Sequence, residues 1–470
     1  IWLKPNMETL QRTANRGSVS TGFNITNSLK LEPDNSERIQ RAHGDIGTPT
    51  NQKIVTISFW MKRTELLASG SMKIFEGVAG GNKTWFGWNN DRIKIKSDFA
   101  NPQNLITTRV FRDTSAWYHI VVAIDTSQGT AANRVKLYIN GVQETDFSTE
   151  SYPNQNNNSY FFESNMAHYI GGSAGTDSAA GYWADFYLLD GQVKGPTDFG
   201  EFDEDSGIWT PIAYDGDFGD EGYHIDFKNS AALGADVSGN SNNFGTLTNV
   251  SAVDQATDTP TNNFCTWNLL WVYATQATIS DGATKTVNAS SDWAGAKSTF
   301  GLTKGKWYWE YKALNTGSLN GIQTDGESNI AASGNAQSKL STMALFLGGE
   351  VEVVDSGGSR DDTNVTFTFN ADHTFAIALD MDSSTQTISF YQNGSLITDG
   401  DDINIDGLAD KTVFPFNAVN NNTVTVNFGG YTANAISSAA SDANGYGTFE
   451  FAPPSGYYSI CTKNLAEYGG

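Results

Sequence analysis

The sequence predicts an all-β protein built from two β-sandwich domains. The main reason is a pattern that occurs twice, WYHIVVAIDTSQGTAANRVKLYINGV at 117–142 and TFAIALDMDSSTQTISFYQNGS at 374–395. Each copy has an apolar strand ending at Asp, a polar turn, a second strand and Asn-Gly. Asn-Gly favours a type I′ hairpin turn, because both residues tolerate positive φ. In addition, 47 glycines fit a turn-rich chain, and apolar strands recur about every 8–12 residues.

Residues 1–22 are polar and irregular and predict a connector, so the first sandwich is expected at 23–191. Its expected strands are 28–32, 54–61, the hairpin 84–96, 117–125, 135–140 and 182–189. Side chains alternate along a strand, so Ile57, Phe59 and Met61 are expected on one face of the central strand.

Residues 192–264 are acidic and glycine-rich, and they predict a bridge between the domains. The bridge contains several aromatic residues, which favour a structured segment over a flexible linker. The second sandwich is expected at 265–470, with Trp307 and Trp309 in its core. Its expected strands include 306–311, 344–347, 351–354, 365–369, 374–380, 414–416 and 423–428.

The charge of the chain argues against two classes of partner. The sequence has 29 Lys+Arg against 52 Asp+Glu, a formal charge of −23. Such a surface repels phosphate backbones and anionic lipids, so neither nucleic acid nor membrane insertion is expected. No stretch approaches the roughly 18 apolar residues of a membrane span. The start, IWLKP, lacks the basic and apolar regions of a signal peptide, and the chain is expected to be one segment of a longer polypeptide.

Two cysteines, Cys265 and Cys461, stand near the two ends of the second domain. The first and last strands of a sandwich often lie side by side, so a disulfide between them is geometrically open. Two buried free thiols are the preferred prediction, because two cysteines do not make a disulfide scaffold.

Several segments carry resemblances to known families. ISFWMKR at 57–63, WYHIVVAID at 117–125, VKLYING at 135–141 and ADFYLLDGQ at 184–192 resemble laminin-G-like, concanavalin A-like jelly rolls. GKWYWEYK at 305–312, FAIALDMD at 375–382, ISFYQNG at 388–394, FPFNA at 414–418 and VNFGG at 426–430 resemble a SPRY-type sandwich. The resemblance therefore implies two jelly-roll-type β-sandwich domains.

The bridge resembles segments between such modules in fibre-like and appendage proteins of marine bacteriophages. The segments that carry this likeness are LDGQ at 189–192, DFGEFD at 198–203, DVSGN at 236–240, TDTPTNNF at 257–264 and CTKNL at 461–465. The likeness implies a viral setting and says little about the ligand, since these folds host many functions.

A glycosidase is the enzyme alternative, because concanavalin A-like folds include glucanases. Such enzymes need carboxylates that flank one sugar bond. Glu201, Asp203 and Asp205 have i, i+2, i+4 spacing but lie in the acidic bridge, where a solvated turn is expected. His119 is expected to be a packed histidine, and no HExxH, GxSxG or Cys–His metal spacing occurs, so no catalytic residue is predicted.

A calcium site is open at one acidic stretch. DINIDG at 402–407 matches the first half of a calcium loop, but Val413 stands where the bidentate Glu belongs, so it is not an EF-hand. The stretch still offers oxygen ligands for Ca²⁺ at a sandwich rim, the alternative being a plain acidic turn. The candidate ligands are Asp399, Asp401, Asp402, Asn404 and Asp406.

The best candidate for sugar binding is Trp85, with Asn89, Asn90 and Asp91 in the next turn. Sugars stack on exposed aromatic rings and form hydrogen bonds with Asn and Asp side chains. Trp85 is expected on the face opposite Phe86. Packing in a core is the alternative role for this tryptophan.

The sequence thus predicts a non-enzymatic adhesin of a bacteriophage tail fibre or capsid appendage. It is expected to bind host cell-surface glycans and other virion subunits, as a homo-oligomer and most readily a trimer, so that weak sites add in avidity. The alternatives are a structural spacer or decoration protein that makes subunit contacts only, and a polysaccharide depolymerase.

Overall fold

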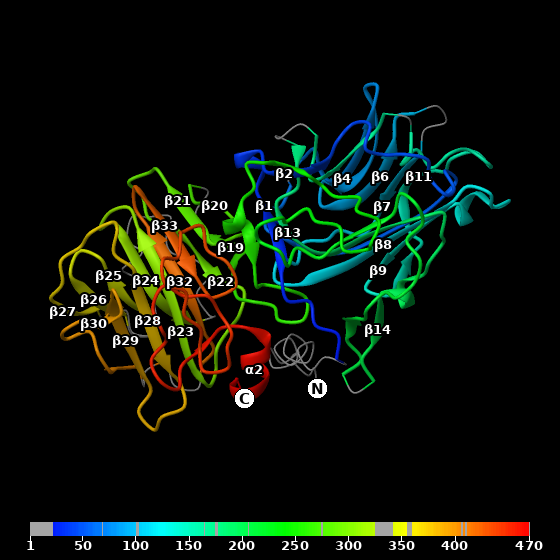
Figure 1. Ribbon diagram of the computed structural model, residues 1–470. Helices are drawn as coiled ribbons and strands as arrows, with labels where there is room; N and C mark the ends of the chain where they lie inside the picture. Colours follow the sequence, from blue (N-terminus) through cyan, green and yellow to red (C-terminus); the bar gives the residue numbers. More distant parts are fainter. Residues whose placement is uncertain are drawn as a thin grey trace, which may run out of the picture. The chain divides into compact units, whose positions relative to one another are not determined.

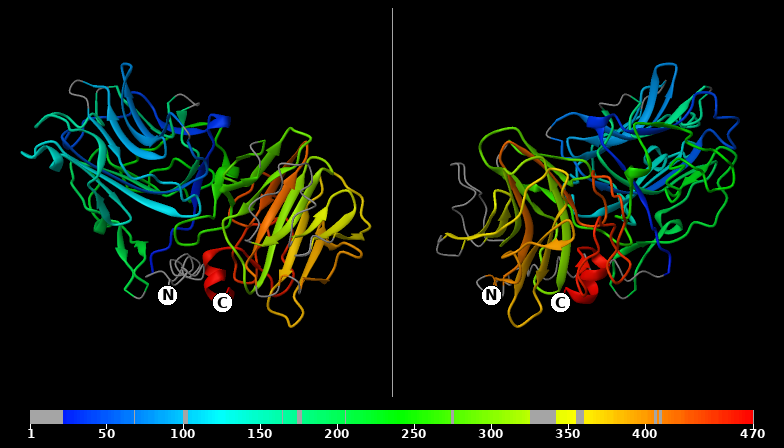
Figure 2. Two further views of the ribbon diagram at one scale, coloured as in Figure 1. Left: turned by 180° about the vertical axis from the view of Figure 1, so that it is seen from behind. Right: turned by 60° about the vertical axis from the view of Figure 1, so that its left-hand side comes forward.

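The computed structural model describes residues 22–469 except 68, 100–102, 164, 174–176, 205, 274–275, 325–341, 355–359, 406–407 and 409–410. The chain divides into two compact units, here called the first unit, Val19–Thr261, and the second unit, Asn262–Gly470. Each unit is a β-sandwich of two layered sheets (Figures 1 and 2). The prediction of an all-β chain with two sandwich domains is confirmed.

The first unit has two antiparallel sheets. Sheet 1 runs in the order β10 (Val142–Glu144), β9 (Val135–Ile139), β8 (Trp117–Asp125), β3 (Ile54–Arg63), β13 (Gly181–Asp190), β1 (Ser28–Leu31) and β18 (Gln255–Ala256), with β16 (Tyr223–Ile225) paired to β13. Sheet 2 runs in the order β11 (Phe147–Ser151), β7 (Asn104–Thr107), β6 (Arg92–Ser97), β5 (Asn82–Asn89), β4 (Ser71–Ala79), β12 (Ala167–Ile170), β2 (Arg38–Arg41) and β17 (Thr246–Thr248). The short 3-10 helices are η1 (Pro33–Asn35), η2 (Ala131–Asn133), η4 (Pro196–Asp198) and η5 (Ala252–Asp254).

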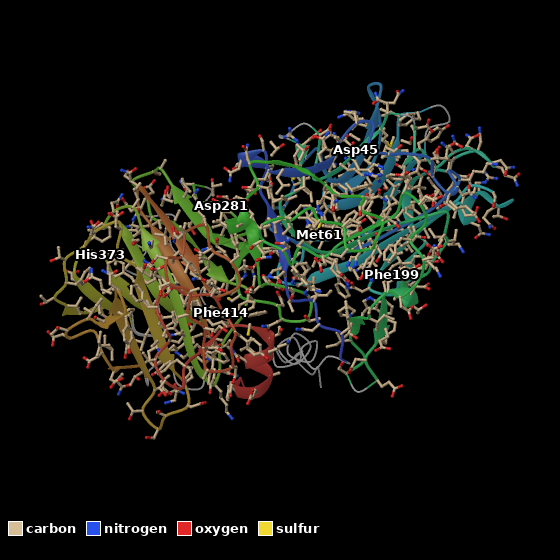
Figure 3. The ribbon with its side chains drawn as sticks, in the orientation of Figure 1. Asp45, Met61, Phe199, Asp281, His373 and Phe414 are labelled. Carbon is tan, nitrogen blue, oxygen red and sulfur yellow. The ribbon has the colours of Figure 1, made fainter. Side chains whose placement is uncertain are left out.

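The core of the first unit lies between these sheets. Ile57, Phe59 and Met61 all lie on its inner side, as their alternation in β3 predicts, and all are fully buried (Figure 3 labels Met61). The ring of Phe59 lies between Phe86 and Phe186, with centroids 5.3 and 5.2 Å away. Stacked aromatic rings contribute beyond their buried area, so this triple stack anchors the two sheets to each other.

The bridge segment belongs to the first unit as far as Thr261. Three of its strands, β16, β17 and β18, extend the two sheets, and β14 (Gly200–Phe202) pairs with β15 (Trp209–Pro211) as a separate ribbon. Aromatic side chains of the bridge cover the outer face of sheet 1, where Phe199, Tyr214 and Phe218 pack on Tyr187 (Figure 3 labels Phe199). The aromatic content that favoured a structured segment is used for this cover.

The second unit repeats the architecture. One sheet has the order β19 (Trp267–Tyr273), β22 (Ala294–Ser298), β32 (Val413–Val419), β24 (Ser318–Thr324), β25 (Thr342–Phe346), β26 (Glu350–Val354) and β27 (Arg360–Asn364). The other has the order β20 (Thr278–Ser280), β21 (Lys285–Asn288), β33 (Asn422–Asn427), β23 (Lys306–Ala313), β28 (Phe375–Asp380), β29 (Thr387–Gln392) and β30 (Ser395–Leu396). Off this order, β31 (Ile403–Asn404) pairs with β29 and β34 (Tyr458–Ser459) with β23, and helix α2 (Thr462–Tyr468) ends the unit. Trp307 and Trp309 lie in its core, as predicted.

The two Asn-Gly turns have the conformation that the repeated pattern predicts. The φ angles are 48° and 81° at Asn140 and Gly141, and 50° and 74° at Asn393 and Gly394. Positive φ at both central residues is the mark of a type I′ turn. The glycines are needed for a second reason: a Cβ on Gly141 would meet the Trp209 ring at 2.4 Å, and one on Gly394 would meet Phe451 at 2.7 Å.

Both cysteines are buried free thiols, as predicted. Their backbones are neighbours, because Phe264 pairs with Cys461 and the Cys265 N–H donates to the Ile460 carbonyl at 2.9 Å. Cys265 therefore stands opposite Ile460. Since side chains alternate along paired segments, its thiol points away from the side of Cys461. Adjacent positions in this pairing keep the thiols on opposite faces and do not favour a disulfide.

Candidate functional site

The two sheets of the first unit differ in what lies on their outer faces. The outer face of sheet 1 is covered by bridge aromatics, whereas sheet 2 keeps half-exposed side chains along β6 and β7, among them Lys94, Lys96 and Asn104. Trp85 lies on this face, directly between Glu76 of β4 and Lys96 of β6 in the strand register. The outer face of sheet 2 around Trp85, here called the Trp85 face, is the candidate site.

Two lysines cover the ring of Trp85. The ammonium groups of Lys73 and Lys94 lie 6.0 and 5.5 Å from its centroid, within the range of cation–π attraction. With these arms in place the side chain of Trp85 is 5% exposed. Lysine stems are flexible and their heads seek water, so a ring covered by lysine side chains is less firmly closed than a ring in a core.

Cations dominate the Trp85 face, although the chain as a whole is acidic. Among the described strand residues of sheet 2, the outward positions hold one carboxylate, Glu76. The cationic side chains at outward positions are Arg38, Lys73, Lys83, Arg92, Lys94 and Lys96. Sequence reasoning missed this set, but the two-residue turn after Asn89 fixes the register that puts Trp85 opposite Lys96, so pairing the hairpin residue by residue finds it.

Most of these lysines already hold a carboxylate. Glu76 lies 3.2 Å from the ammonium groups of both Lys73 and Lys83, and Asp177 from a neighbouring loop also pairs with Lys73. Lys96 pairs with Asp98 at 2.6 Å. Because the four lysines at positions 73, 83, 94 and 96 share three carboxylates, the face retains positive charge.

Lys94 differs from Lys73 in its charge environment. Among the residues that the structure describes, Lys94 forms no ion pair; burial lowers its pKa, and repulsion from Lys96 adds to this although Asp98 opposes it. Burial also lowers the pKa of Lys73, but Asp177 and Glu76 outweigh it and the pKa is raised. Two ammonium groups on one ring thus have opposite shifts, because one has carboxylate partners and the other has not.

The structure does not gather the four predicted sugar-binding residues into one site. Asp91 is 3% exposed and points inward, where it binds Arg63 and Arg112 at 2.9 Å each and accepts the Leu67 N–H at 2.8 Å. Burial alone would raise the pKa of Asp91, but these hydrogen bonds lower it below its ordinary value. Asp91 thus has a structural role beneath the turn, away from the outer face that carries Trp85.

Asn89 and Asn90 are the other two residues of that predicted set. The amide of Asn89 donates to Ser71 Oγ at 2.8 Å, and Asn90 is exposed in the turn with a φ of 49°. Ligand binding by this set stays a prediction, and the contacts around Trp85 favour its lysine neighbours as the polar part of the site.

Of the predicted calcium ligands, Asp399, Asp401 and Asp402 lie in turns and bends of the second unit, and Asn404 lies in β31. Asp399, Asp401, Asp402 and Asn404 are exposed, and Asp406 lies outside the described residues. The Asp402 N–H donates to Ser389 Oγ at 2.9 Å. In the described part of the chain no three His, Cys, Asp or Glu side chains come together as a metal site, so calcium binding here stays a prediction.

His119 and Ser58 form a buried pair whose proton arrangement is unsuited to catalysis. The indole N–H of Trp209 donates to His119 Nδ1 at 3.0 Å, and His119 Nε2 lies 2.9 Å from Ser58 Oγ. An indole nitrogen only donates, so Nδ1 carries the lone pair and the proton sits on Nε2. The imidazole therefore donates to Ser58 and cannot take its proton. Burial lowers the pKa of His119 to about 3, which keeps the ring neutral.

The carboxylates with glycosidase-like spacing lie in and after the β14 ribbon. Glu201 is exposed, and Asp205 lies outside the described residues. Asp203 closes a turn, since its carboxylate accepts the backbone N–H and hydroxyl of Ser206 at 2.7 and 2.6 Å. This geometry matches a solvated acidic turn.

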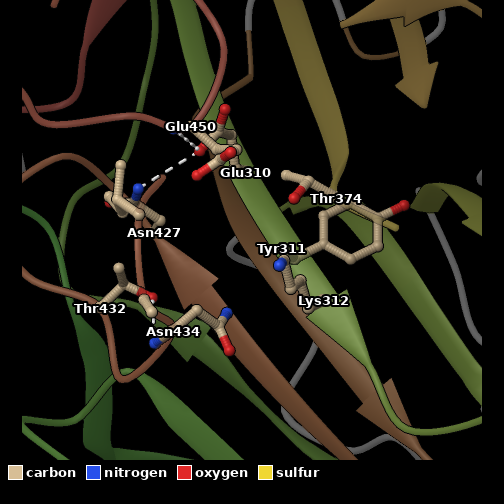
Figure 4. A pocket seen from close by; sticks show the side chains of 10 residues that line it. Glu310, Tyr311, Lys312, Thr374, Asn427, Thr432, Asn434 and Glu450 are labelled. Atoms are coloured by element: carbon tan, nitrogen blue, oxygen red, sulfur yellow. Dashed lines mark hydrogen bonds between the residues drawn. The ribbon is translucent and has the colours of Figure 1, made fainter. Parts of the chain in front are cut away.

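The second unit contains a small pocket beside Glu310 (Figure 4). Its volume is about 10 Å³, room for about one water molecule. The buried Glu310 carboxylate accepts the backbone N–H groups of Glu450 and Phe451 at 2.8 Å each, the Tyr308 hydroxyl at 3.1 Å and the Asn427 amide at 3.3 Å. These donors connect segment 448–451, here called the covering segment, to β23. The pocket therefore has a structural role, and it is too small for a sugar.

Comparison with known proteins supports a lectin-type fold in the first unit. A family model described as the concanavalin A-like lectin/glucanases superfamily, of laminin G type, matches residues 35–193. The first unit therefore contains a laminin-G-like, concanavalin A-like domain. No curated protein sequence matches the chain.

Solved structures of several β-sandwich proteins are similar in part. The SPRY domain of human HERC1 is 13% identical, with 34% of this chain and 96% of that chain covered and a TM-score of 0.26. A heptameric SAP-like pentraxin from Limulus polyphemus is 13% identical (37% and 80% covered, TM-score 0.27). Domains LG4-5 of the mouse laminin alpha1 chain are 9% identical (94% and 89% covered, TM-score 0.28).

In the described part of the chain no helix has the length and apolar character to cross a bilayer.

Proposed function

We propose that the chain is a non-enzymatic binding protein whose first unit binds glycans on the Trp85 face. The observation that carries the proposal is a tryptophan on a largely polar sheet face, flanked by Lys73 and Lys94 and in register with Lys96 and Asn104. A flat aromatic ring surrounded by hydrogen-bonding groups suits the apolar face and hydroxyl rim of a sugar. The lectin-type description of residues 35–193 supports the same reading.

The Asn104 side chain carries one of the buried polar atoms of this face that have no hydrogen-bond partner in the described part of the chain. Asn104, opposite Lys96 on β7, has a buried Oδ1 that accepts no hydrogen bond. A buried acceptor without a donor is unfavourable by about 1–3 kcal/mol. A sugar hydroxyl that donates to this oxygen while its ring stacks on Trp85 would relieve that cost.

The proposal extends to a virion appendage of a bacteriophage, at a tail or capsid surface. It is supported by the bridge motifs, such as 198–203 and 236–240, that resemble marine phage appendage proteins. In an oligomeric appendage, several copies of the Trp85 face would act on one host cell. Weak single sites then sum to a useful avidity without new contacts.

Binding to an array of host and marine polysaccharides tests the proposal, with Trp85→Ala as the variant. The expected result is a loss of about tenfold in affinity, since stacking contributes up to about 1.5 kcal/mol beyond the buried area. Trp271→Ala is the matched control, because Trp271 is a 37% exposed tryptophan of the second unit. Unchanged binding by a folded Trp85→Ala protein, or loss only in Trp271→Ala, would overturn the assignment to the Trp85 face.

A structural role is the second candidate, and one observation favours it. Leu270 and Trp271 are 58% and 37% exposed on β19, the edge strand of the seven-stranded sheet. Apolar side chains on an open sheet edge favour pairing with another chain. If this edge makes subunit contacts, Leu270→Lys will reduce the oligomer mass in light scattering while glycan binding by single chains persists.

A further inference from the structure

The charge pattern of the Trp85 face bears on which glycans it binds. This question rests on the proposed function. The ammonium groups of Lys73 on β4 and Lys94 on β6 lie 6.0 and 5.5 Å from the centroid of the Trp85 ring. Lys73 holds the carboxylates of Glu76 and Asp177. Lys94 forms no ion pair with any residue that the structure describes, so the arrangement around the ring lacks one anion.

We propose that the ligand of the Trp85 face is a carboxylated polysaccharide, whose uronic acid carboxylate pairs with Lys94 while a sugar ring stacks on Trp85. Asp177 is an example of such a pair, since it is a loop carboxylate that binds a lysine beside the same ring. A ligand carboxylate on Lys94 would give this lysine the kind of partner that Asp177 gives Lys73.

The neighbours of Lys94 favour an anion. Burial disfavours the charge of the Lys94 ammonium, and Lys96, two residues along β6 and on the same face, repels it, so both effects lower the pKa of Lys94. A bound carboxylate opposes both effects, because an opposite charge nearby favours the protonated amine. Charge-assisted hydrogen bonds of this kind are stronger than neutral ones.

The charge of the whole chain makes this local pattern selective. At a net charge of −23 the protein repels polyanions at long range. At physiological salt that repulsion is screened beyond about 8 Å, whereas the contact between Lys94 and a sugar carboxylate is not. Acidic polysaccharides are therefore expected to bind at the locally cationic outer face of sheet 2 and not elsewhere on the acidic surface.

Polygalacturonate and its fully methyl-esterified form test the inference, because they share one backbone and differ in charge. Titration calorimetry of the full chain at physiological salt is expected to give at least about tenfold tighter binding of the acid form. Lys94→Gln should bring the affinity for the acid form down to the affinity of the same variant for the ester. Lys136→Gln is the control: it removes the same charge from half-exposed Lys136 on β9 of sheet 1, and both affinities should stay unchanged.

Each other outcome has one meaning. Equal affinity for the acid and the ester, or an equal effect of Lys94→Gln and Lys136→Gln, overturns the inference. So does the absence of polygalacturonate binding by the folded protein, or binding of dextran sulfate that is stronger and indifferent to Lys94→Gln. If uncharged glycans still bind and Trp85→Ala removes that binding, the proposed function stands while the inference fails; if no glycan binds, both fail.

Discussion

Asn140 holds His119 through two hydrogen bonds of opposite direction. The backbone N–H of Asn140 donates to the His119 carbonyl at 2.9 Å, and its side-chain Oδ1 accepts the His119 N–H at 2.7 Å. Asn393 repeats both bonds with Thr374 in the second unit, at 2.7 and 3.0 Å. The repeated Asn-Gly pattern therefore gives a turn and also two hydrogen bonds that join the turn to the neighbouring strand.

Replacing Asn140 separates the two contributions of this residue. Asn140→Gly keeps the positive φ and leaves the His119 N–H without an acceptor, which is expected to destabilise the first unit by about 1–3 kcal/mol. Asn140→Ala adds the strain of a left-handed conformation, about 1–2 kcal/mol more. Urea denaturation followed by pulse proteolysis measures both. Asn393→Gly is the control, since its effect should fall on the second unit; equal stability of the Ala and Gly variants would contradict the argument.

Asp91 predicts a large effect on stability where surface binding would predict none. Arg63 is fully buried beneath it, with its guanidinium 4.3 Å from the Trp88 ring. Asp91→Asn leaves that buried cation without its anionic partner and is expected to destabilise the first unit by about 3–5 kcal/mol. Asp98→Asn is the control, because the Lys96–Asp98 pair is 35% and 41% exposed and contributes at most about 1 kcal/mol. Similar losses in both variants would contradict a buried role for Asp91.

How far the sequence predicts this molecule depends on the range of the interactions involved. The Asn-Gly turns, the alternating core of β3 and the all-β class follow from neighbours within a few residues, and the structure has them. The inward turn of Asp91 depends on Arg63, which lies 28 residues earlier and reaches it only once β3 and β5 are packed together. The same holds for Trp209, whose bond to His119 spans 90 residues.

The candidate site shows the same division. That Trp85 lies opposite Phe86 is local, but its cover by Lys73 and Lys94 comes from two neighbouring strands. The acidic composition suggested cation ligands. Carboxylates are also used as hydrogen-bond acceptors between distant segments, as when Asp190 at the end of β13 accepts the N–H groups of Thr50 and Glu221.

Two buried histidines predict how the first unit responds to acid. Burial lowers the pKa of His119 and His168 to about 3, against about 6.5 in an unfolded chain. Between these values the unfolded state binds protons that the folded state does not, so stability is complete above pH 6.5 and falls as pH falls toward 3. Each histidine is expected to contribute a slope of about 1.4 kcal/mol per pH unit within that window.

NMR of the imidazole nitrogens checks the histidine argument directly. His119 should stay neutral with its proton on Nε2 down to about pH 4.5, because Trp209 occupies Nδ1. Trp209→Phe removes that donor and should change the Nδ1 shift, whereas Ser58→Ala should change Nε2. Titration of His119 near pH 6.5 in the folded protein would show that the ring is not sealed from water.

The cysteines are expected to remain reduced in air. Cys265 and Cys461 stand on opposite faces of one pairing, and burial raises the pKa of the Cys461 thiol to about 11, which disfavours the reactive thiolate. A thiol reagent such as DTNB should therefore react only after the second unit unfolds. Intact mass with and without reductant measures the disulfide content, and an oxidised native protein would refute the opposed orientation.

Substitution of Glu310 tests whether the covering segment 448–451 is held to the second unit by one carboxylate. Its two carboxylate oxygens take the N–H groups of Glu450 and Phe451 together with the Tyr308 hydroxyl and the Asn427 amide. Burial raises the pKa of Glu310 and these four bonds lower it, with burial the stronger, so the charge itself is unfavourable there while the acceptors are needed.

Two substitutions separate charge from acceptor at this joint. Glu310→Gln removes the charge and keeps one oxygen, so its two effects oppose each other. Glu310→Leu removes both oxygens, strands two backbone donors and should be less stable than Glu310→Gln by at least about 2 kcal/mol. Chemical denaturation gives this difference, and protease cleavage at the covering segment 448–451 locates it. Equal stability of the two variants would mean that the covering segment is held by its aromatic contacts, such as Phe449 on Tyr308, and not by the carboxylate.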